Sequence, residues 1–263
     1  MTVLSITTDF GNTNGFVGVM KGVIYGIAPD VKIVDISQLI SAQNVLEGAY
    51  AMWRAVPYFP PGSVHVGVVD PGVGTERRPI GAHLGDQYFI APDNGLLTPL
   101  IQDAEQNGEF VEFIHLDNPK YWLPKVSNTF HGRDIFAPTG AHLAAGVPLN
   151  EMGTSITDPI RLDLPRPEKT EVGWRAHVTI IDVFGNLTTD LPAEALEGRR
   201  DVLFRIHGRE IDGLIDSYGH REIGDLVAVV DSEEYIEISI VNGDAARALN
   251  AKTGDVVEVF YRD

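Results

Sequence analysis

The chain contains no cysteine among its 263 residues. Thiol nucleophiles, disulfides and thiolate metal sites are therefore excluded, and the composition is typical of a reducing compartment, so we expect a cytoplasmic protein. Long apolar runs are missing as well. No stretch approaches the roughly 20 residues that cross a bilayer, and strand-like sequence begins at Val3 without a charged leader. We expect a soluble protein with no membrane partner.

Sequence patterns for metal binding and for serine hydrolysis are also missing. Eight histidines are scattered along the chain, and none forms a His-x-x-x-His or His-Glu-x-x-His pattern. A metal ion would need ligands from distant segments. No Gly-x-Ser-x-Gly elbow is present, which argues against a serine hydrolase. We therefore expect no metal and no cofactor.

Basic residues are few. The chain has 20 lysines and arginines against 37 aspartates and glutamates, a formal net charge of −17. An acidic surface repels phosphate backbones, so nucleic acid is not an expected partner. A cationic or zwitterionic small molecule is tolerated by such a surface, although solubility alone also explains the charge.

The first half of the chain alternates strand and helix patterns. Val-rich or Ile-rich strands are predicted at Val3–Asp9, Val31–Ile36 and Ser63–Asp70, and helices at Gly15–Ala28 and Val45–Val56. This order predicts a mainly parallel sheet covered by helices. Three further elements are predicted, namely a hairpin about Gly85-Asp86, a strand at Phe110–Leu116 and a helix at Asp134–Ala145.

A proline-rich stretch divides the chain. Pro159, Pro165 and Pro167 mark a linker at residues 161–172, between an α/β domain at 1–160 and a second domain at 173–263. Helical periodicity mostly disappears after the linker, and short strands separated by turns take its place. The predicted fold class is α/β, with an N-terminal βαβ parallel-sheet domain and a smaller C-terminal all-β barrel or sandwich.

Asp70 is the strongest candidate for a functional acid. It ends a buried strand, and ligands bind at the carboxyl ends of strands in open α/β sheets. The glycine-rich turn Pro71–Gly74 then bends the chain back, so that a guanidinium from Arg77 or Arg78 reaches the same carboxylate.

Other polar clusters have both functional and structural interpretations. Asp9 suits a contact to a ribose diol, and it equally suits an N-cap for the following helix. His131 lies in a dense polar cluster, yet a lone histidine before a helix is more often structural, and Arg133 and Asp134 can simply pair. The segment from Asp182 to Asn186 reads on spacing alone as a hairpin in which Gly185 and Asn186 have positive φ.

The ordered set of motifs resembles the S-adenosylmethionine (SAM) hydrolase family, also called SAM hydroxide adenosyltransferases, which is related to fluorinase and chlorinase. The resemblance runs from residue 8 to about 246. It is carried by Thr8–Gly11, Val68–Gly74, Ala91–Gly95, Thr129–Pro138, Asp182–Asn186 and Asn242–Gly243.

The resemblance implies displacement at the ribose 5′ carbon of SAM by a water-derived hydroxide, giving adenosine and methionine. The leaving group is a neutral thioether and needs no acid, so the demand falls on a water held in line and made more nucleophilic. The family's catalytic triad maps onto Asp70, Arg77 and His131, with Arg78 as a one-residue alternative to Arg77.

The same resemblance implies the binding residues and the assembly. Asp9 would hold the ribose diol, Asp182 and Ser232 the methionine end, and Asn242 and Gly243 the adenine. The other substrate-binding residues implied are Asn14, Thr129, Phe130, Phe184 and Asn186. Family members are homotrimers whose pocket lies between the first domain of one subunit and the second domain of its neighbour. Glu234 stands where the family commonly has glycine.

Three other functions compete with hydrolysis. A SAM halogenase resembles the chain strongly, but tyrosine stands there in place of Asp70 and a small residue in place of His131. A buried carboxylate would also repel a halide. A non-catalytic adenosine- or SAM-binding protein would not need the triad. A metal-dependent hydrolase would lose activity to a chelator.

Overall fold

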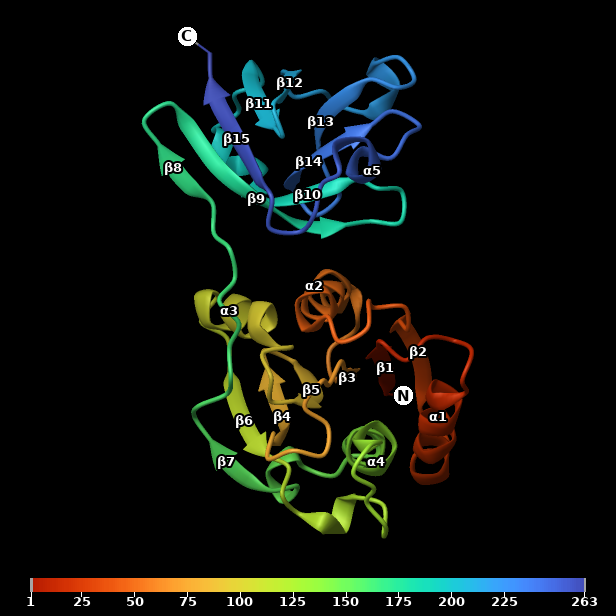
Figure 1. The fold of residues 1–263 in the computed structure, drawn as a ribbon. Helices are drawn as coiled ribbons and strands as arrows, with labels where there is room; N and C mark the ends of the chain where they lie inside the picture. The colour runs from red at the N-terminus through yellow and green to blue at the C-terminus, as the bar shows by residue number, and fades with distance from the viewer. Residues whose placement is uncertain (1, 263) are drawn as a thin grey trace. The chain divides into compact units, whose positions relative to one another are not determined.

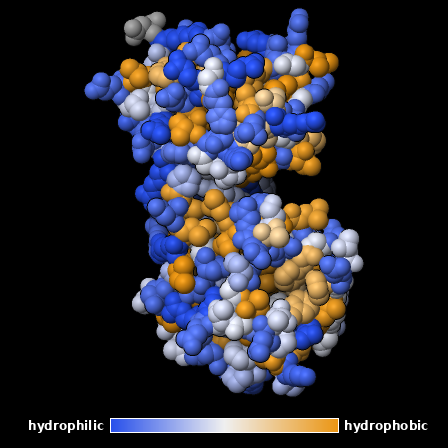
Figure 2. All heavy atoms as spheres, in the orientation of Figure 1, coloured by the Kyte–Doolittle hydropathy of each residue, from blue (hydrophilic) through white to orange (hydrophobic). Residues whose placement is uncertain are grey.

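The computed structural model describes residues 2–262, and these form two compact units that divide between Leu162 and Asp163 (Figure 1). The two units are described separately. Hydrophilic side chains cover much of the face of each unit drawn in Figure 2, with apolar ones scattered among them, in keeping with the net charge of −17.

The first unit combines a sheet with four α-helices. Its strands are β1 (Val3–Thr8), β2 (Lys32–Ser37), β3 (Val64–Val68), β4 (Pro79–Leu84), β5 (Gln87–Pro92), β6 (Val111–His115) and β7 (Thr154–Ile156). Its helices are α1 (Phe16–Ile27), α2 (Val45–Ala55), α3 (Thr98–Gln106) and α4 (Ala137–Ala144). Short 3-10 turns at Val56–Tyr58, Pro119–Tyr121 and Leu149–Glu151 connect them, and a π-helical turn at Gly132–Phe136 precedes α4.

The seven strands are ordered β2-β1-β3-β5-β4-β6-β7, and only the first four are parallel. The prediction of a mainly parallel sheet was therefore wrong for half of the strand pairs. The reason is the predicted hairpin about Gly85-Asp86, which reverses the chain so that β5, not β4, pairs with β3. Strands β6 and β7 then continue the antiparallel half.

Each face of this sheet has its own apolar core. On one face, Leu4 and Ile6 of β1 pack with Met20 of α1 and Ala141 of α4. On the other, Met52 of α2 and Ile101 of α3 belong to one buried cluster with Phe89 of β5, which is fully buried. Covering helices on both faces protect the parallel strands and leave the strand ends for loops.

Local sequence explains where two of the helices begin. Asn44 caps α2, because its side chain accepts a hydrogen bond from the backbone N–H of Glu47. The predicted helix Asp134–Ala145 instead opens with the π-turn, in which the N–H of Ala137 bonds the carbonyl of Gly132. Pro138 has no N–H to give to the carbonyl of Asp134, which accepts from Leu123 at 2.9 Å instead. Helix α3 was not predicted.

The second unit is built almost entirely from strands. They are β8 (Glu168–Thr170), β9 (Gly173–Ile181), β10 (Leu187–Pro192), β11 (Val202–Ile206), β12 (Arg209–Asp212), β13 (Leu226–Val230), β14 (Tyr235–Ile240) and β15 (Val256–Tyr261). It also holds the short helix α5 (Ala245–Leu249) and 3-10 turns at Ala193–Leu196 and Tyr218–His220. The stretch 161–172 that was predicted as a linker thus contributes β8, which pairs with β9.

The sheet of the second unit is nearly closed. Its order is β12-β11-β15-β9-β10-β14-β13, and Leu214, just after β12, bridges to Ala228 in β13. The two end strands therefore meet, and the sheet curls into a near-barrel around Phe204, Val257 and Ile238, which are fully buried. Closure leaves few unpaired strand edges.

His65 gives the first unit a pH-dependent stability. Its ring is fully buried, bonded to Ser5 Oγ at 2.7 Å and to Gln87 Oε1 at 2.5 Å, and burial lowers its pKa from 6.5 to about 4. The unfolded chain therefore takes up this proton first as the pH falls. This contribution to stability is present above pH 6.5 and is lost, by about 3 kcal/mol, as the pH falls from 6.5 to about 4.

Urea titrations between pH 4 and 7.5 check this expectation. His65→Gln is expected to have a lower unfolding free energy at pH 7.5 and a flatter pH dependence than the wild type, because other titrating groups are unchanged. Parallel pH profiles for the two proteins would show that His65 is not the source.

Candidate active site

Asp70 lies just beyond the carboxyl end of β3, at the start of a tight turn. The N–H of Val73 bonds the carbonyl of Asp70 at 3.2 Å, and the N–H of Thr75 bonds that of Gly72 at 3.2 Å. At Gly74, φ is +77°, and an added Cβ would lie 2.2 Å from the backbone oxygen of Asn128. Only glycine lets the turn approach the segment that carries His131 this closely.

The turn returns Arg77 to the Asp70 carboxylate. Arg77 Nε donates to Oδ1 at 3.1 Å and Nη2 donates to Oδ2 at 2.6 Å, a two-pronged ion pair. Both side chains are almost completely buried, with 7% of Arg77 and 4% of Asp70 exposed. The guanidinium carbon also lies 5.2 Å from the centre of the Phe136 ring.

Arg77 connects Asp70 to His131. Its Nη2 lies 3.0 Å from His131 Nδ1. A guanidinium can only donate, so Nδ1 accepts, and the neutral imidazole carries its proton on Nε2. Burial, followed by the positive charge of Arg77, lowers the pKa of His131 and favours this neutral form. The three side chains form a linear array with arginine in the middle.

The electrostatics of this array favour proton acceptance at Asp70. Burial raises the pKa of the Asp70 carboxyl, and the Arg77 guanidinium opposes the rise. Burial likewise lowers the pKa of Arg77, opposed by Asp70. One donor remains unused, since the buried Arg77 Nη1 has no hydrogen-bond partner among residues 2–262. The array therefore offers an acceptor oxygen and a free N–H in one buried place.

The structure decides between the two adjacent arginines. Arg78 points to Asp93, with Nε donating to Oδ2 at 2.8 Å, and to Asp158, with Nη1 donating to Oδ1 at 3.0 Å. Asp93 is 1% exposed and also accepts from the N–H of Ile160. Arg78 and Asp93 thus hold residues 158–160, near the end of the first unit, and Arg77 is the arginine of the array.

Asp9 does not cap the following helix. Gly15 is the N-cap of α1, and Asp9 Oδ2 instead accepts from the backbone N–H of Gln43 at 2.8 Å. Asp9 lies at the end of β1, beside β3, so its carboxylate and that of Asp70 share one edge of the sheet. Asn14 is exposed in the turn that connects Asp9 to α1.

An aromatic cluster that the sequence did not predict stands next to His131. The rings of Phe10, Phe16 and Phe130 meet edge to face, with centroids 5.3–6.0 Å apart. Phe16 is 44% exposed. Phe10 follows Asp9 in the sequence and Phe130 precedes His131, and these neighbours were the available signal for the cluster.

The polar residues around His131 are partly structural. Asp134 is fully buried and accepts a hydrogen bond from Arg133 Nε at 2.6 Å. Arg133 and Asp134 therefore pair with each other, as in the structural interpretation of this cluster. It also accepts from the N–H and the hydroxyl of Ser127 at 2.8 and 2.6 Å. These bonds hold the 127–134 loop that presents His131. Thr129 is exposed on that loop.

In the second unit, Asp182 closes its own turn. Its Oδ1 accepts from the N–H groups of Phe184 and Asn186 at 2.9 Å, and its Oδ2 from the Asn186 amide at 2.9 Å. The turn is the predicted hairpin, joining β9 to β10, but only Gly185 has a positive φ. Phe184 is 71% exposed at its tip.

This turn packs against the segment that carries Asn242 and Gly243. The N–H of Ala246 bonds the carbonyl of Gly185 at 2.9 Å, and a Cβ on Gly185 would lie 2.0 Å from Asp244 Oδ1. Two predicted substrate-binding segments, 60 residues apart in the sequence, therefore meet. Asn242 is exposed, with φ of 51°.

Ser232 lies on a third turn of the second unit. It is exposed and donates to Glu233 Oε1 at 2.9 Å, while Thr188 of β10 donates to Asp231 in the same turn at 3.3 Å. Glu234, where the resemblance commonly has glycine, adopts φ of 64°. This left-handed conformation explains why glycine suits the position.

Glu237 is a polar residue of the second unit that the sequence analysis missed. It is 5% exposed, and Tyr218 and Ser239 each donate to its Oε1 at 2.6 Å. Burial raises its pKa, and burial also raises the pKa of Tyr218 to about 12. The negative charge of Asp182 also contributes to raising the pKa of both groups. In the sequence, the available signal for Glu237 was an acidic residue within the largely apolar strand β14.

Among residues 2–262, no group of three or more histidine, aspartate or glutamate side chains is arranged to hold a metal ion. No described helix is both long and apolar enough to cross a membrane.

Two family models match the chain. The SAM hydroxide adenosyltransferase N-terminal domain matches residues 4–153, and the C-terminal domain of the same family matches residues 176–258. The chain belongs to this family. The matched residues include Asp70, Arg77 and His131 in the first domain, and Asp182, Ser232 and Asn242 in the second.

Proteins similar to this family member include hydrolases and fluorinases. An (R)-S-adenosyl-L-methionine hydrolase of Salinispora tropica is 35% identical, over 97% of both chains. One of Methanocaldococcus jannaschii is 34% identical, over 99% of this chain and 97% of the other. A fluorinase of Actinoplanes is 29% identical over 98% and 97%. The crystal structure of an uncharacterized conserved protein from Thermotoga maritima matches with a TM-score of 0.90 and 34% identity, covering 99% of this chain and all of the other.

The close approach at Gly74 predicts the effect of a small substitution. Gly74→Ala is expected to lower the unfolding free energy by about 2 kcal/mol or more, because positive φ strain adds to the clash with Asn128. Gly62→Ala is the matched control, since φ is +78° there and nothing lies within 4 Å of the added Cβ. Urea unfolding of both variants measures the difference. Equal losses would mean that the turn and the His131 loop are not in tight contact.

Proposed function

We propose that this chain hydrolyses S-adenosyl-L-methionine to adenosine and L-methionine by attack of water on the ribose 5′ carbon. The observation that carries the proposal is the buried Asp70–Arg77–His131 array. It occurs in a member of a family whose curated relatives at 34–36% identity are named (R)-S-adenosyl-L-methionine hydrolase.

The array can supply what the displacement needs. The C–S bond breaks with its electron pair going to sulfur, and the C–O bond forms from water. The sulfonium becomes a neutral thioether, so the chemical work lies in positioning the water and removing its proton. In this proposal the free Arg77 Nη1 donates to the water oxygen and Asp70, whose pKa is raised, accepts the proton. Neutral His131 keeps Arg77 in place through Nδ1.

Charge favours water over halide as the nucleophile. Fluorinases of 27–29% identity are among the relatives, so halide attack is the second candidate. An ionised Asp70 beside the nucleophile position would repel an anion, whereas it assists deprotonation of water.

The substrate would be held by residues from both units. We assign Asp9 to the ribose diol, Asp182 and Ser232 to the methionine end, and Asn242 with Gly243 to adenine. Asn14, Thr129, Phe130, Phe184 and Asn186 complete the proposed set. The Gln43 bond uses only Oδ2 of the Asp9 carboxylate, which supports a diol contact through Oδ1. Asp182 is strongly committed to its own turn, so it would bind through its remaining lone pairs.

Reaction in ¹⁸O-labelled water tests hydrolysis directly. The purified protein with SAM is expected to give adenosine labelled in the 5′ hydroxyl, together with methionine. A 5′-halogenated nucleoside formed in added chloride or fluoride would favour halide transfer instead. Unlabelled adenosine, or none, would refute the proposal.

Asp70→Asn keeps the shape of the side chain and removes its charge. We expect a fall in kcat of about 10²–10⁴-fold, since general-base help is lost, with adenosine affinity by calorimetry unchanged. Asp35→Asn is the control, because Asp35 lies near the carboxyl end of β2 but pairs with Lys21 on the surface. A normal rate in Asp70→Asn would remove the carboxylate from the mechanism.

We also propose a homotrimer whose sites are shared between subunits. The assigned residues are divided between residues 1–162 and 163–263, and Val183 and Phe184 are 91% and 71% exposed, as expected for a surface that another molecule covers. Native mass spectrometry is expected to give three times the 28.7 kDa of one chain.

Complementation tests the sharing of sites. Asp70→Asn and Asp182→Asn subunits, each inactive alone, are expected to regain activity when co-expressed in equal amounts. With random assembly, about a quarter of all sites would then combine an intact Asp70 with an intact Asp182 from the neighbour. If each site belongs to a single chain, mixing restores nothing.

A further inference from the structure

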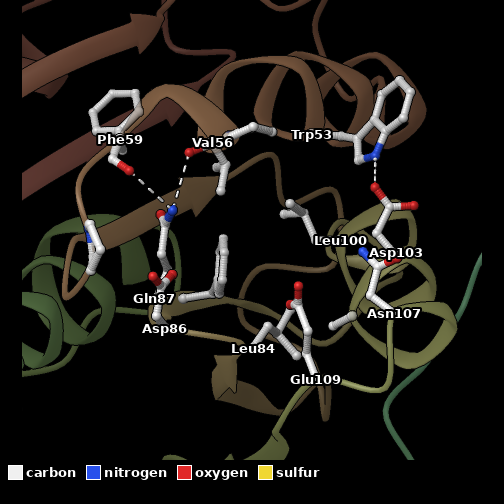
Figure 3. Close-up of a pocket in the computed structure, with 14 residues that line it drawn as sticks. Trp53, Val56, Phe59, Leu84, Asp86, Gln87, Leu100, Asp103, Asn107 and Glu109 are labelled. Carbon is white, nitrogen blue, oxygen red and sulfur yellow. Dashed lines mark hydrogen bonds between the residues drawn. The ribbon is translucent and has the colours of Figure 1, made fainter.

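A cavity lies on the first unit (Figure 3). It has a volume of about 440 Å³ and is lined by fourteen residues from the end of α2, the following 3-10 turn, the β4–β5 hairpin and α3. Gln87 begins β5 here, whereas Asp70 follows the end of β3. Since β3 and β5 are parallel, the cavity is at the opposite edge of the sheet. The proposed hydrolysis does not use it.

The floor of the cavity is apolar. Val56, Leu84, Phe89 and Leu100 line it and are each less than 9% exposed. The rings of Trp53 and Phe59 stand at its sides. The lining as a whole exposes more polar than apolar surface, so a small molecule that has both a polar head and an apolar part suits it better than a purely apolar one.

Hydrogen bonds hold the walls in place. The Trp53 indole donates to Asp103 Oδ2 at 2.5 Å and so fastens α2 to α3. Gln87 Nε2 donates to the carbonyls of Val56 and Phe59 at 3.2 and 3.4 Å, and its Oε1 is fixed by the buried His65 (Figure 3). A preformed cavity loses little conformational entropy when it binds a ligand.

The rim of the cavity is negatively charged. Asp86, Asp103 and Glu109 contribute carboxylates, and no lysine, arginine or histidine lines the cavity. Asp103 accepts from the Trp53 indole, and the charge of Asp86 also acts on His83, which does not line the cavity. A cation above the apolar floor would pair with the carboxylates of the rim.

We propose that this cavity binds a small organic cation, an ammonium group carried on an apolar body. The apolar part would fill the space between Trp53, Phe59 and Phe89, and the ammonium would lie between Asp86 and Glu109. The net charge of −17 attracts cations over the whole surface, and the cavity adds apolar residues beside its carboxylates. A neutral or anionic analogue of the same shape should therefore bind less well.

Indole N–H resonances of the ¹⁵N-labelled protein test the proposal. The chain has three tryptophans, at 53, 122 and 174, and only Trp53 lines the cavity. Titration with 2-phenylethylammonium is expected to shift the Trp53 signal saturably, with a Kd of roughly 1 mM, and to leave Trp122 and Trp174 unmoved. Trp53→Phe assigns the signal. The anion 3-phenylpropionate should cause no comparable shift.

Charge-neutral variants complete the test. Asp86→Asn with Glu109→Gln is expected to weaken binding about tenfold, because two ion pairs are lost. Asp30→Asn removes an exposed carboxylate elsewhere on the same unit and should leave the Kd unchanged. The proposal is overturned by the absence of a saturable shift, by equal binding of the anion, or by an unchanged Kd in the double variant. None of these readouts requires SAM, so the outcome is independent of the hydrolysis.

Discussion

The ion pair between Asp70 and Arg77 is the interaction on which the candidate active site depends. Both groups are out of water, so loss of one partner would leave a buried charge uncompensated, a cost of about 3–5 kcal/mol. The pair needs β3 to deliver the acid and Gly74 to turn the chain tightly against Asn128. It also sets the protonation of His131, because Arg77 can only donate to Nδ1.

The rest of the first unit supports this geometry from a distance. Asp134 fixes the loop before α4 through Arg133 and Ser127, so that His131 reaches Arg77. Arg78 is turned outward onto Asp93, which keeps it from competing for Asp70. Two neighbouring arginines thus have different partners: Arg77 joins the array that we propose to be catalytic, and Arg78 has a structural role.

In the second unit, hydrogen bonds and close packing likewise hold the turns that carry proposed binding residues. Asp182, Gly185 and Asp244 hold two turns together, and these carry most of the residues proposed for the methionine and adenine ends. Proposed binding residues therefore also stabilise the backbone that presents them. Substitutions there would change substrate affinity and turn geometry together, whereas Asp70→Asn separates charge from shape.

Local sequence was sufficient for elements whose signals are short-range: the strand ending at Asp70, the Gly85-Asp86 hairpin, the helix before Pro57, and the ordered motifs that identify the family. It was not sufficient for α3, or for the position of β5 beside β3, since strand order depends on contacts between distant segments. The neutral His131 and the cavity at the far edge of the sheet came only from tertiary structure. The resemblance already favoured Arg77 over Arg78, and tertiary structure showed that the two arginines have different partners. Burial and the direction of a side chain are set by what packs around it, and no spacing along the chain encodes them.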